Sequence, residues 1–412
     1  MLSIEFIREN IEAIKESCRQ RGIELDFDDF IKIDDQRRTA IQKVEDLRRQ
    51  RNELSQQKKP DSETIAKGQN LKEAIKKAET EFKQFEEKVV QFITQVPNIL
   101  MPQVPAGTSE DDNVVLRNWG QPPQFDFEAK SYLELGEELN LIDIPRAARM
   151  AGSRFSYLKN ELVLMQFALL NLVYETTQEF GFQPVIPPVM IKPKLMELLG
   201  YADLTESNIY FIEKDELNLV GTSEQSIAAM YQDEVLDEVP RRFVGYSTCF
   251  RREAGSYGRD LKGILRVHQF DKAELFSFCH PDDSSQEHEL LIKIEERIMQ
   301  SLELPYRVVL LCGGDLAKPS ATTVDIESWL PSEGRYRETH SSSNCTDYQS
   351  QGLNIRYRTP GGKLDYVHTL NGTALAMSRI LAVILENYQQ ADGTIAVPRI
   401  LQKYLGFKQI PR

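Results

Sequence analysis

Cysteine is scarce in this sequence, and its spacing argues against two common uses of the residue. Five cysteines occur among 412 residues; none forms a CxxC pair, and none lies at zinc-finger spacing from the five histidines. Disulfide frameworks and structural zinc sites need such patterns. We therefore expect a reduced, cytoplasmic protein without structural zinc. The cysteines are Cys18, Cys249, Cys279, Cys312 and Cys345.

Long apolar runs are also missing. The longest, Leu162 to Tyr174, is interrupted by Gln166 and Asn171. It falls short of the roughly 20 apolar residues that span a bilayer. The first ten residues, MLSIEFIREN, contain early acidic residues and no apolar core of a signal peptide. We expect neither a transmembrane helix nor a secretion signal.

Two glycine-rich motifs that bind nucleotide phosphates are absent. The sequence contains neither GxGxxG nor GxxxxGK(S/T), which argues against a Rossmann site and a P-loop. Predicted helices alternate irregularly with short β-rich runs, such as 243–250 and 267–278, without a βαβ repeat. The pattern predicts an α+β fold, in which an antiparallel sheet is flanked by helices.

The chain is acidic overall, but basic residues are concentrated in one segment. The net charge of −13 argues against a surface that binds nucleic acid throughout. Between Gln36 and Pro60, however, eight basic residues face three acidic ones, a local charge of +5. The stripe is suited to contacting phosphates, but charge alone slightly favours a solvated helix face. The basic residues are Arg37, Arg38, Lys43, Arg48, Arg49, Arg51, Lys58 and Lys59.

The first hundred residues contain two coiled-coil patterns. Apolar or small residues follow steps of four and three from Leu71 to Val96, and steps of seven from Ile33 to Leu54. Pro60 lies between the two runs, where Asp61 or Ser62 can cap the second helix. Two helices of about 35 residues predict an antiparallel arm of roughly 50 Å. A Pro-rich segment follows, so we expect an N-terminal helical domain over residues 1–105 and a second domain over 106–412.

The segment from Cys249 to Phe278 predicts a β-hairpin with a long polar tip. Alternation would place Arg251 and Glu253 on one face of its first strand. On the second strand it would place Phe270 and Glu274 on one face, about 13 Å apart. An arginine for a phosphate, an aromatic ring for a purine and a carboxylate for an ammonium would suit an aminoacyl-adenylate. Taken singly, Phe270 could be a core residue. Arg251 and Glu253 could form a surface ion pair.

This hairpin resembles motif 2 of class II aminoacyl-tRNA synthetases, in the form FR-x-EAGS…RVHQF…E of the seryl-tRNA synthetases. Gly181–Pro188 resembles motif 1, and Leu370–Pro398 resembles motif 3. LVGTSEQS resembles the family's serine-binding T-x-E segment, and PSEGRYRETHSSSNCTDYQ its ATP-contacting segment. The likeness covers nearly the entire chain. It implies a serine–tRNA ligase, dimeric through the motif 1 region, with a class II catalytic domain over 106–412 and an N-terminal tRNA-binding arm.

Motif by motif, the resemblance also implies roles for individual residues. Serine recognition falls on Thr222, Ser223, Glu224, Glu274 and Thr373, where the i, i+2 spacing of Thr222 and Glu224 suits one strand. ATP contacts fall on Arg251, Arg252, Glu253, Val267, Phe270, Glu338, Thr339, His340, Ser341 and Arg379. Arg251, Glu338 and Arg379 would be catalytic. Glu338 and Ser341 would hold Mg²⁺ through oxygen ligands.

The implied reaction converts L-serine and ATP to seryl-adenylate and then charges tRNA(Ser), and tRNA(Sec) as a further substrate. Residues of about 30–95 would grip the long variable arm of the tRNA. His268 and His340 are expected to be packed or hydrogen-bonded rather than catalytic. Two rival interpretations are an amino-acid:carrier-protein ligase, which the arm argues against, and an inactive RNA-binding relative. The presence of Arg251, Arg379 and Glu224 argues against the second.

Overall fold

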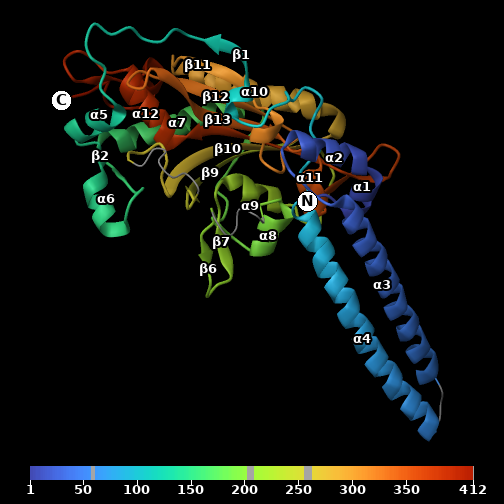
Figure 1. Ribbon diagram of the computed structural model, residues 1–412. Helices are drawn as coiled ribbons and strands as arrows, with labels where there is room; N and C mark the ends of the chain where they lie inside the picture. The colour runs from blue at the N-terminus through green and yellow to red at the C-terminus, as the bar shows by residue number, and fades with distance from the viewer. Residues whose placement is uncertain (57–60, 202–207, 255–261, 412) are drawn as a thin grey trace. The chain divides into compact units, whose positions relative to one another are not determined.

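Two long helices form most of the N-terminal part of the chain in the computed structural model, which describes residues 1–56, 61–201, 208–254 and 262–411. Two short helices, α1 (Ile4–Glu9) and α2 (Ile11–Gln20), precede α3 (Phe27–Ser55) and α4 (Ser62–Ile93). Figure 1 shows α3 and α4 lying side by side. Pro60 and its predicted turn lie outside the described residues.

The seam between α3 and α4 follows the predicted coiled-coil pattern. Ala40, Val44, Ile75, Ala78 and Val89 are all buried at or below 5% exposure. The arm helices contain 29 and 32 residues, so the predicted 35 was too long. At 1.5 Å per residue they span roughly 45 Å.

Side-chain caps explain where these helices begin. The Asp61 carboxylate accepts a hydrogen bond from the Thr64 backbone N–H at 2.8 Å, and so caps α4. Asp26 caps α3 in the same way, by accepting from the Asp29 N–H. At this end of the arm, away from Asp61, the rings of Phe30 and Phe92 stack at 4.6 Å between centroids. The predicted cap at Asp61 or Ser62 is therefore Asp61.

The chain divides into two compact units. One contains Leu2–Arg19 and Ile23–Val96, and the other contains Met1, Gln20–Gly22 and Pro97–Arg412. Within the described residues, no helix has both the length and the apolar character needed to cross a membrane. All five cysteines are buried and free.

The second unit is built on an eight-stranded sheet in the order β1-β11-β12-β13-β16-β10-β9-β4. Neighbouring strands are antiparallel except β4 and β9, which pair in parallel. The predicted antiparallel α+β fold is thus confirmed. The strands are β1 (Val114–Trp119), β4 (Gln183–Val185), β9 (Arg241–Phe250), β10 (Gln269–Cys279), β11 (Tyr306–Leu310), β12 (Thr322–Leu330), β13 (Arg335–Asn344) and β16 (His368–Ala376).

Both faces of this sheet are covered. Alternate residues of β10, such as Ala273 and Leu275, enter a large core with the apolar residues of α7 (Glu161–Gln178), α10 (Ser284–Ser301) and α12 (Met377–Asn387). Phe276 and Phe278 point to the other face and enter a smaller core with Ile227 of α9 (Ser223–Ala229). Residues 270, 272 and 274 share that second face but belong to neither core.

Smaller elements complete the unit. The helices are α5 (Tyr132–Glu138), α6 (Ile144–Ala151), α8 (Pro193–Leu198) and α11 (Tyr348–Leu353), with 3₁₀ turns at Glu110–Asp112, Pro281–Asp283, Gly313–Asp315 and Arg399–Tyr404. The short strands are β2 (Ile142–Asp143), β3 (Tyr157–Leu158), β5 (Met190–Ile191), β6 (Phe211–Ile212), β7 (Leu217–Leu219), β8 (Val235–Leu236), β14 (Arg356–Arg358), β15 (Leu364–Tyr366), β17 (Ile395–Ala396) and β18 (Gln409–Ile410).

Candidate active site

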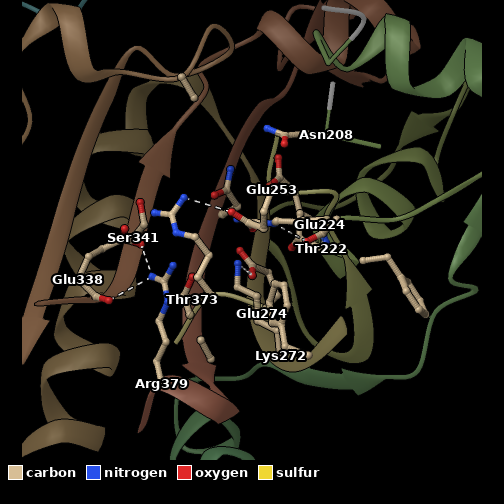
Figure 2. A pocket seen from close by; sticks show the side chains of 18 of the residues that line it. Asn208, Thr222, Glu224, Glu253, Lys272, Glu274, Glu338, Ser341, Thr373 and Arg379 are labelled. Carbon is tan, nitrogen blue, oxygen red and sulfur yellow. Dashed lines mark hydrogen bonds and ion pairs between the residues drawn. The ribbon is translucent and has the colours of Figure 1, made fainter. Parts of the chain in front are cut away.

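A cavity of about 330 Å³ opens on the second face of the sheet, between β10, β13, β16 and the start of α9. Figure 2 shows acidic and basic side chains converging on it from these elements. Its volume lies at the lower end of the range for small-molecule sites. The residues implied by the resemblance that line it are Thr222, Glu224, Arg251, Glu253, Val267, Phe270, Glu274, Glu338, Thr339, Ser341, Thr373 and Arg379.

Strand alternation on β10 supplies the floor of the cavity. Phe270, Lys272 and Glu274 all point into it, as the side-chain period of two requires. Glu274 lies opposite Thr373 in the β10–β16 ladder. The predicted common face of Phe270 and Glu274 is therefore present, with a lysine between them.

The first strand of the hairpin differs from its prediction. β9 ends at Phe250, and Arg251 and Glu253 follow it in an irregular segment. The prediction that these residues share a strand face was wrong. Glu253 has a left-handed backbone with φ of 51°, which ends the strand alternation. Both side chains nevertheless line the cavity, where the Arg251 guanidinium lies 5.4 Å from the centroid of the Phe270 ring.

Thr222 and Glu224 reach the cavity from a helix start, so their predicted placement on one strand was wrong. Thr222 is the N-cap of α9, and its hydroxyl accepts from the Glu224 N–H at 3.3 Å. The Glu224 carboxylate accepts from Tyr201 at 2.8 Å and from Gln349 at 2.7 Å. Burial and the nearby Glu274 raise the pKa of Glu224.

Two β-bulges shift which residues face the cavity. In the β12–β13 ladder, Glu327 pairs with Glu338 and Ile326 with His340, which leaves Thr339 as an extra residue. Glu338 and Ser341 are three positions apart, and without the bulge they would face opposite sides of the sheet. A second bulge leaves Ala374 unpaired in β16. It separates Asn371 and Thr373 from the next cavity-lining residues, beginning at Ala376.

An ion pair joins the start of α12 to β13. Arg379 donates to the Glu338 carboxylate at 2.7 Å and to the Glu338 backbone carbonyl at 3.1 Å. Figure 2 shows this pair beside Ser341. The Glu338 side chain is 49% exposed, so a ligand in the cavity can reach it.

Three residues implied by the resemblance lie outside the cavity lining: Ser223, Arg252 and His340. The Ser223 hydroxyl donates to the Gly245 carbonyl at 3.4 Å. His340 pairs with Ile326 beyond the bulge and is buried on the opposite side of β13. Burial lowers the pKa of His340 to about 3, so its ring is neutral at physiological pH. The other motif histidine, His268, is hydrogen-bonded to the Arg251 carbonyl at 2.9 Å.

Several lining residues were missed at the level of sequence. Lys272 could have been found from strand alternation, because it lies between Phe270 and Glu274. Tyr201 also lines the cavity, and Gln349 supports Glu224 from outside the lining. Neither has such a local signal, since they meet Glu224 only through the fold. Further lining residues without an implied role are Asn208, Gln225, Arg266, Ser320, Ser343, Asn371 and Ser378.

Comparison with known proteins supplies the family. Residues 1–100 match the seryl-tRNA synthetase N-terminal domain, and residues 209–388 match the class II tRNA synthetase core domain (G, H, P, S and T). Serine–tRNA ligase of Dictyoglomus turgidum is 42% identical over 100% of this chain and 99% of its own. The chain belongs to the serine–tRNA ligase family. This membership agrees with the seryl-tRNA synthetase resemblance of the motifs.

Solved structures of serine–tRNA ligases share this fold. Seryl-tRNA synthetase from Pyrococcus horikoshii, complexed with ATP, gives a TM-score of 0.89 at 40% identity and covers 100% of this chain and 99% of its own. The cytoplasmic enzyme from Naegleria fowleri, in complex with AMP, gives 0.83 at 32% identity, with 97% and 95% covered. Both of those complexes contain an adenine nucleotide.

Proposed function

We propose that this serine–tRNA ligase uses the cavity to form seryl-adenylate from L-serine and ATP, and then charges tRNA(Ser), with tRNA(Sec) as a further substrate. One observation carries the proposal: Arg251, Phe270 and Glu274 line the same cavity. The adenosine would lie near Phe270, the serine near Glu274, and the reacting phosphate between them. An inactive RNA-binding relative is the alternative, and it predicts no adenylate formation.

The serine end of the cavity is polar and buried. Thr222, Glu224, Glu274 and Thr373 supply oxygen atoms there, and none is more than 6% exposed. These groups suit the ammonium and hydroxyl of serine. Alanine would leave buried polar groups unpaired and should be rejected strongly, whereas threonine must be excluded by shape.

The ATP end carries the cations. In-line attack of the serine carboxylate on the α-phosphate releases pyrophosphate and needs no nucleophilic side chain, only position and positive charge. We assign Arg251 to the α-phosphate and Arg379 to the γ-phosphate, with Glu253 and Val267 beside the nucleotide. Because Arg251 lies over one face of Phe270, adenine binding to that same face would displace the guanidinium.

Magnesium is implied by the family, and the residues fit it. Glu338 and Ser341 present a carboxylate and a hydroxyl on one side of β13, which are oxygen ligands of the kind Mg²⁺ takes. Throughout the described part of the chain, no cluster of three or more His, Cys, Asp or Glu side chains could hold a metal ion. ATP phosphates and water would therefore complete the coordination. A bound Mg²⁺ would neutralise charge on the phosphates.

Serine-dependent exchange of pyrophosphate into ATP tests the proposal. Each amino acid is tried at a matched concentration, and serine should be preferred over alanine and threonine. Arg251→Ala should lower the exchange rate by at least about 10²-fold, because it removes the charge that stabilises the transition state. Arg241→Ala, at the opposite end of β9, is the matched control and should be near normal. Normal exchange by Arg251→Ala would refute the assigned role, and no exchange by the unmodified protein would refute the proposed function.

We assign tRNA binding to the arm, over residues of about 30–95. The net positive charge of residues 36–60 is partly neutralised by acidic side chains of α4. Arg48 pairs with Glu79 of α4 at 2.7 Å, and Lys43 with Glu81 at 3.1 Å. These acidic partners lie outside the stretch whose charge was counted. We expect electrostatic tRNA binding, with a salt dependence set by the phosphate contacts that remain.

We also propose a homodimer through the motif 1 region. Leu164 and Phe167 of α7 are each 53% exposed, and Ile186, just after β4, is 80% exposed. Large apolar side chains exposed on consecutive elements indicate a protein-binding surface. A second copy of the chain, joined about a twofold axis, would cover them.

A further inference from the structure

Lys272 occupies the middle of the cavity floor, and the family resemblance implies no role for it. It lies on β10 between Phe270 and Glu274, with only 8% of the residue exposed. Its ammonium forms an ion pair with the Glu274 carboxylate. Figure 2 shows the two side chains together at the floor of the cavity. A buried lysine of this kind needs such a partner, because its charge is costly to remove from water.

The serine end holds more negative charge than one amino acid can balance. Glu224 is 4% exposed and Glu274 is 1% exposed, and both face the cavity. Serine brings one ammonium to this end, while its carboxylate must approach the phosphate of ATP. Two buried carboxylates against one ammonium would leave an unpaired charge in a poorly solvated site. Lys272 removes this excess, since the three side chains together carry a single negative charge.

We propose that Lys272, paired with Glu274, keeps both carboxylates of the serine subsite ionised, so that Glu224 can accept the single ammonium of serine. The inference rests on the proposed function. Lys272 is a positioning residue here: it acts through the two carboxylates and not on the reacting atoms. The subsite would thereby favour an amino acid with one ammonium and an uncharged side chain.

The balance has a consequence for pH dependence. Burial and Glu274 raise the pKa of Glu224, and the charge of Lys272 opposes that rise. Without Lys272, Glu224 takes up a proton at a higher pH and loses its attraction for the ammonium. Other titratable or charged groups that interact with these three side chains are Tyr201, Cys249 of β9, Glu295 of α10, Glu338 and His340 of β13, and Cys345.

The test measures the KM values for serine and for ATP in pyrophosphate exchange, from about pH 6.5 to about pH 8.5. Lys272→Met should raise the serine KM by at least about tenfold near pH 7 and leave the ATP KM within about twofold. The difference in serine KM should shrink as the pH rises, because Glu224 regains its charge. Lys272→Arg should restore both the affinity and the flat pH profile. Lys159→Met breaks an ion pair with Asp143 away from the cavity and should match the unmodified protein.

A double variant distinguishes the proposed electrostatic role of Lys272 from a purely structural role. Glu224→Gln removes the carboxylate whose charge Lys272 maintains, so serine binds poorly in this variant. Adding Lys272→Met to Glu224→Gln should not raise the serine KM above that of Glu224→Gln alone at any pH, because no Glu224 charge remains to be lost. A structural role for Lys272 predicts a further rise in the serine KM, since a second lesion would then add to the first. Lys272→Gln replaces Lys272→Met in both backgrounds if the methionine variant does not fold.

Three results would overturn the inference: an unchanged serine KM in Lys272→Met, a rise that is the same at every pH, or a change confined to the ATP KM. The last would place Lys272 on the phosphate instead. Failure of the proposed function is a separate outcome, because it appears as missing exchange in the unmodified protein.

Discussion

Gly372 lies on β16 between Asn371 and Thr373, two residues that line the cavity. A side chain added at Gly372 would place its Cβ 2.7 Å from the Glu295 carboxylate and 3.1 Å from the Ser342 hydroxyl. Glu295 belongs to α10 and is fully buried, and burial raises its pKa well above the usual range. Gly372 therefore lets a buried carboxyl group approach the strand that carries Thr373.

This contact predicts the effect of a single methyl group. Gly372→Ala should destabilise the protein by about 1–3 kcal/mol, because neither β16 nor the buried Glu295 can move freely. Gly361→Ala is the control, since a Cβ there meets nothing closer than 4.0 Å, and its stability should be nearly unchanged. Urea denaturation followed by circular dichroism measures both variants. Equal stability of the two would contradict the proposed packing of Glu295 against Gly372.

At the scale of elements, the sheet positions the site through two departures from regular pairing. The bulges at Thr339 and Ala374 change the side-chain parity of β13 and β16. As a result Glu338 joins Ser341, and Ala376 joins Thr373, on the cavity side. Without the bulges, some of these residues of β13 and of β16 would be buried on the opposite face of the sheet. The arm is simpler, because its two helices are specified by a local heptad pattern.

The arm carries an element-scale prediction. Deleting about residues 30–95 should leave serine-dependent pyrophosphate exchange within about twofold, because the cavity residues all lie in the second unit, and should lower tRNA charging by at least about 10²-fold. Exchange and charging are measured on the same preparation. Unchanged charging by the truncated protein would exclude a role of the arm in tRNA binding.

A milder change to the arm serves as a control for misfolding. In the full-length chain, Arg48→Gln combined with Arg51→Gln removes two exposed cations and the Arg48–Glu79 ion pair but leaves the apolar seam intact. If both contact phosphate, the slope of log affinity for tRNA against log salt should fall by about two. An unchanged slope would place the tRNA contact elsewhere on the arm.

At the scale of the whole molecule, the proposed dimer accounts for apolar surface that a single chain leaves exposed. Phe167→Asp combined with Ile186→Asp should convert the dimer to a monomer in size-exclusion chromatography with light scattering, because two buried charges would face the partner. Ile65→Asp, at a side chain that is 53% exposed on α4, is the control and should remain dimeric. A dimer that survives the double substitution would rule out this surface as the interface.

The sequence determined a large part of this protein. The arm follows from the heptad pattern, the α+β class from the absence of a βαβ repeat, and the family from motifs spread over nearly the whole chain. Phe270 and Glu274 were placed correctly because strand alternation depends only on neighbours. The predictions that failed concern Arg251 with Glu253 and Thr222 with Glu224, where a strand gives way to a loop or a helix start.

Only the tertiary structure decided the rest. Tyr201 and Gln349 reach Glu224 across long separations in the chain, and the bulges arise from how strands pair, so neither leaves a local pattern. The same is true of Ser223, Arg252 and His340, which lie beside cavity residues in sequence yet outside the cavity lining. Periodicity reports which face a residue takes within one element. Which faces meet, and which charges they must balance, depends on packing between elements that are distant in sequence.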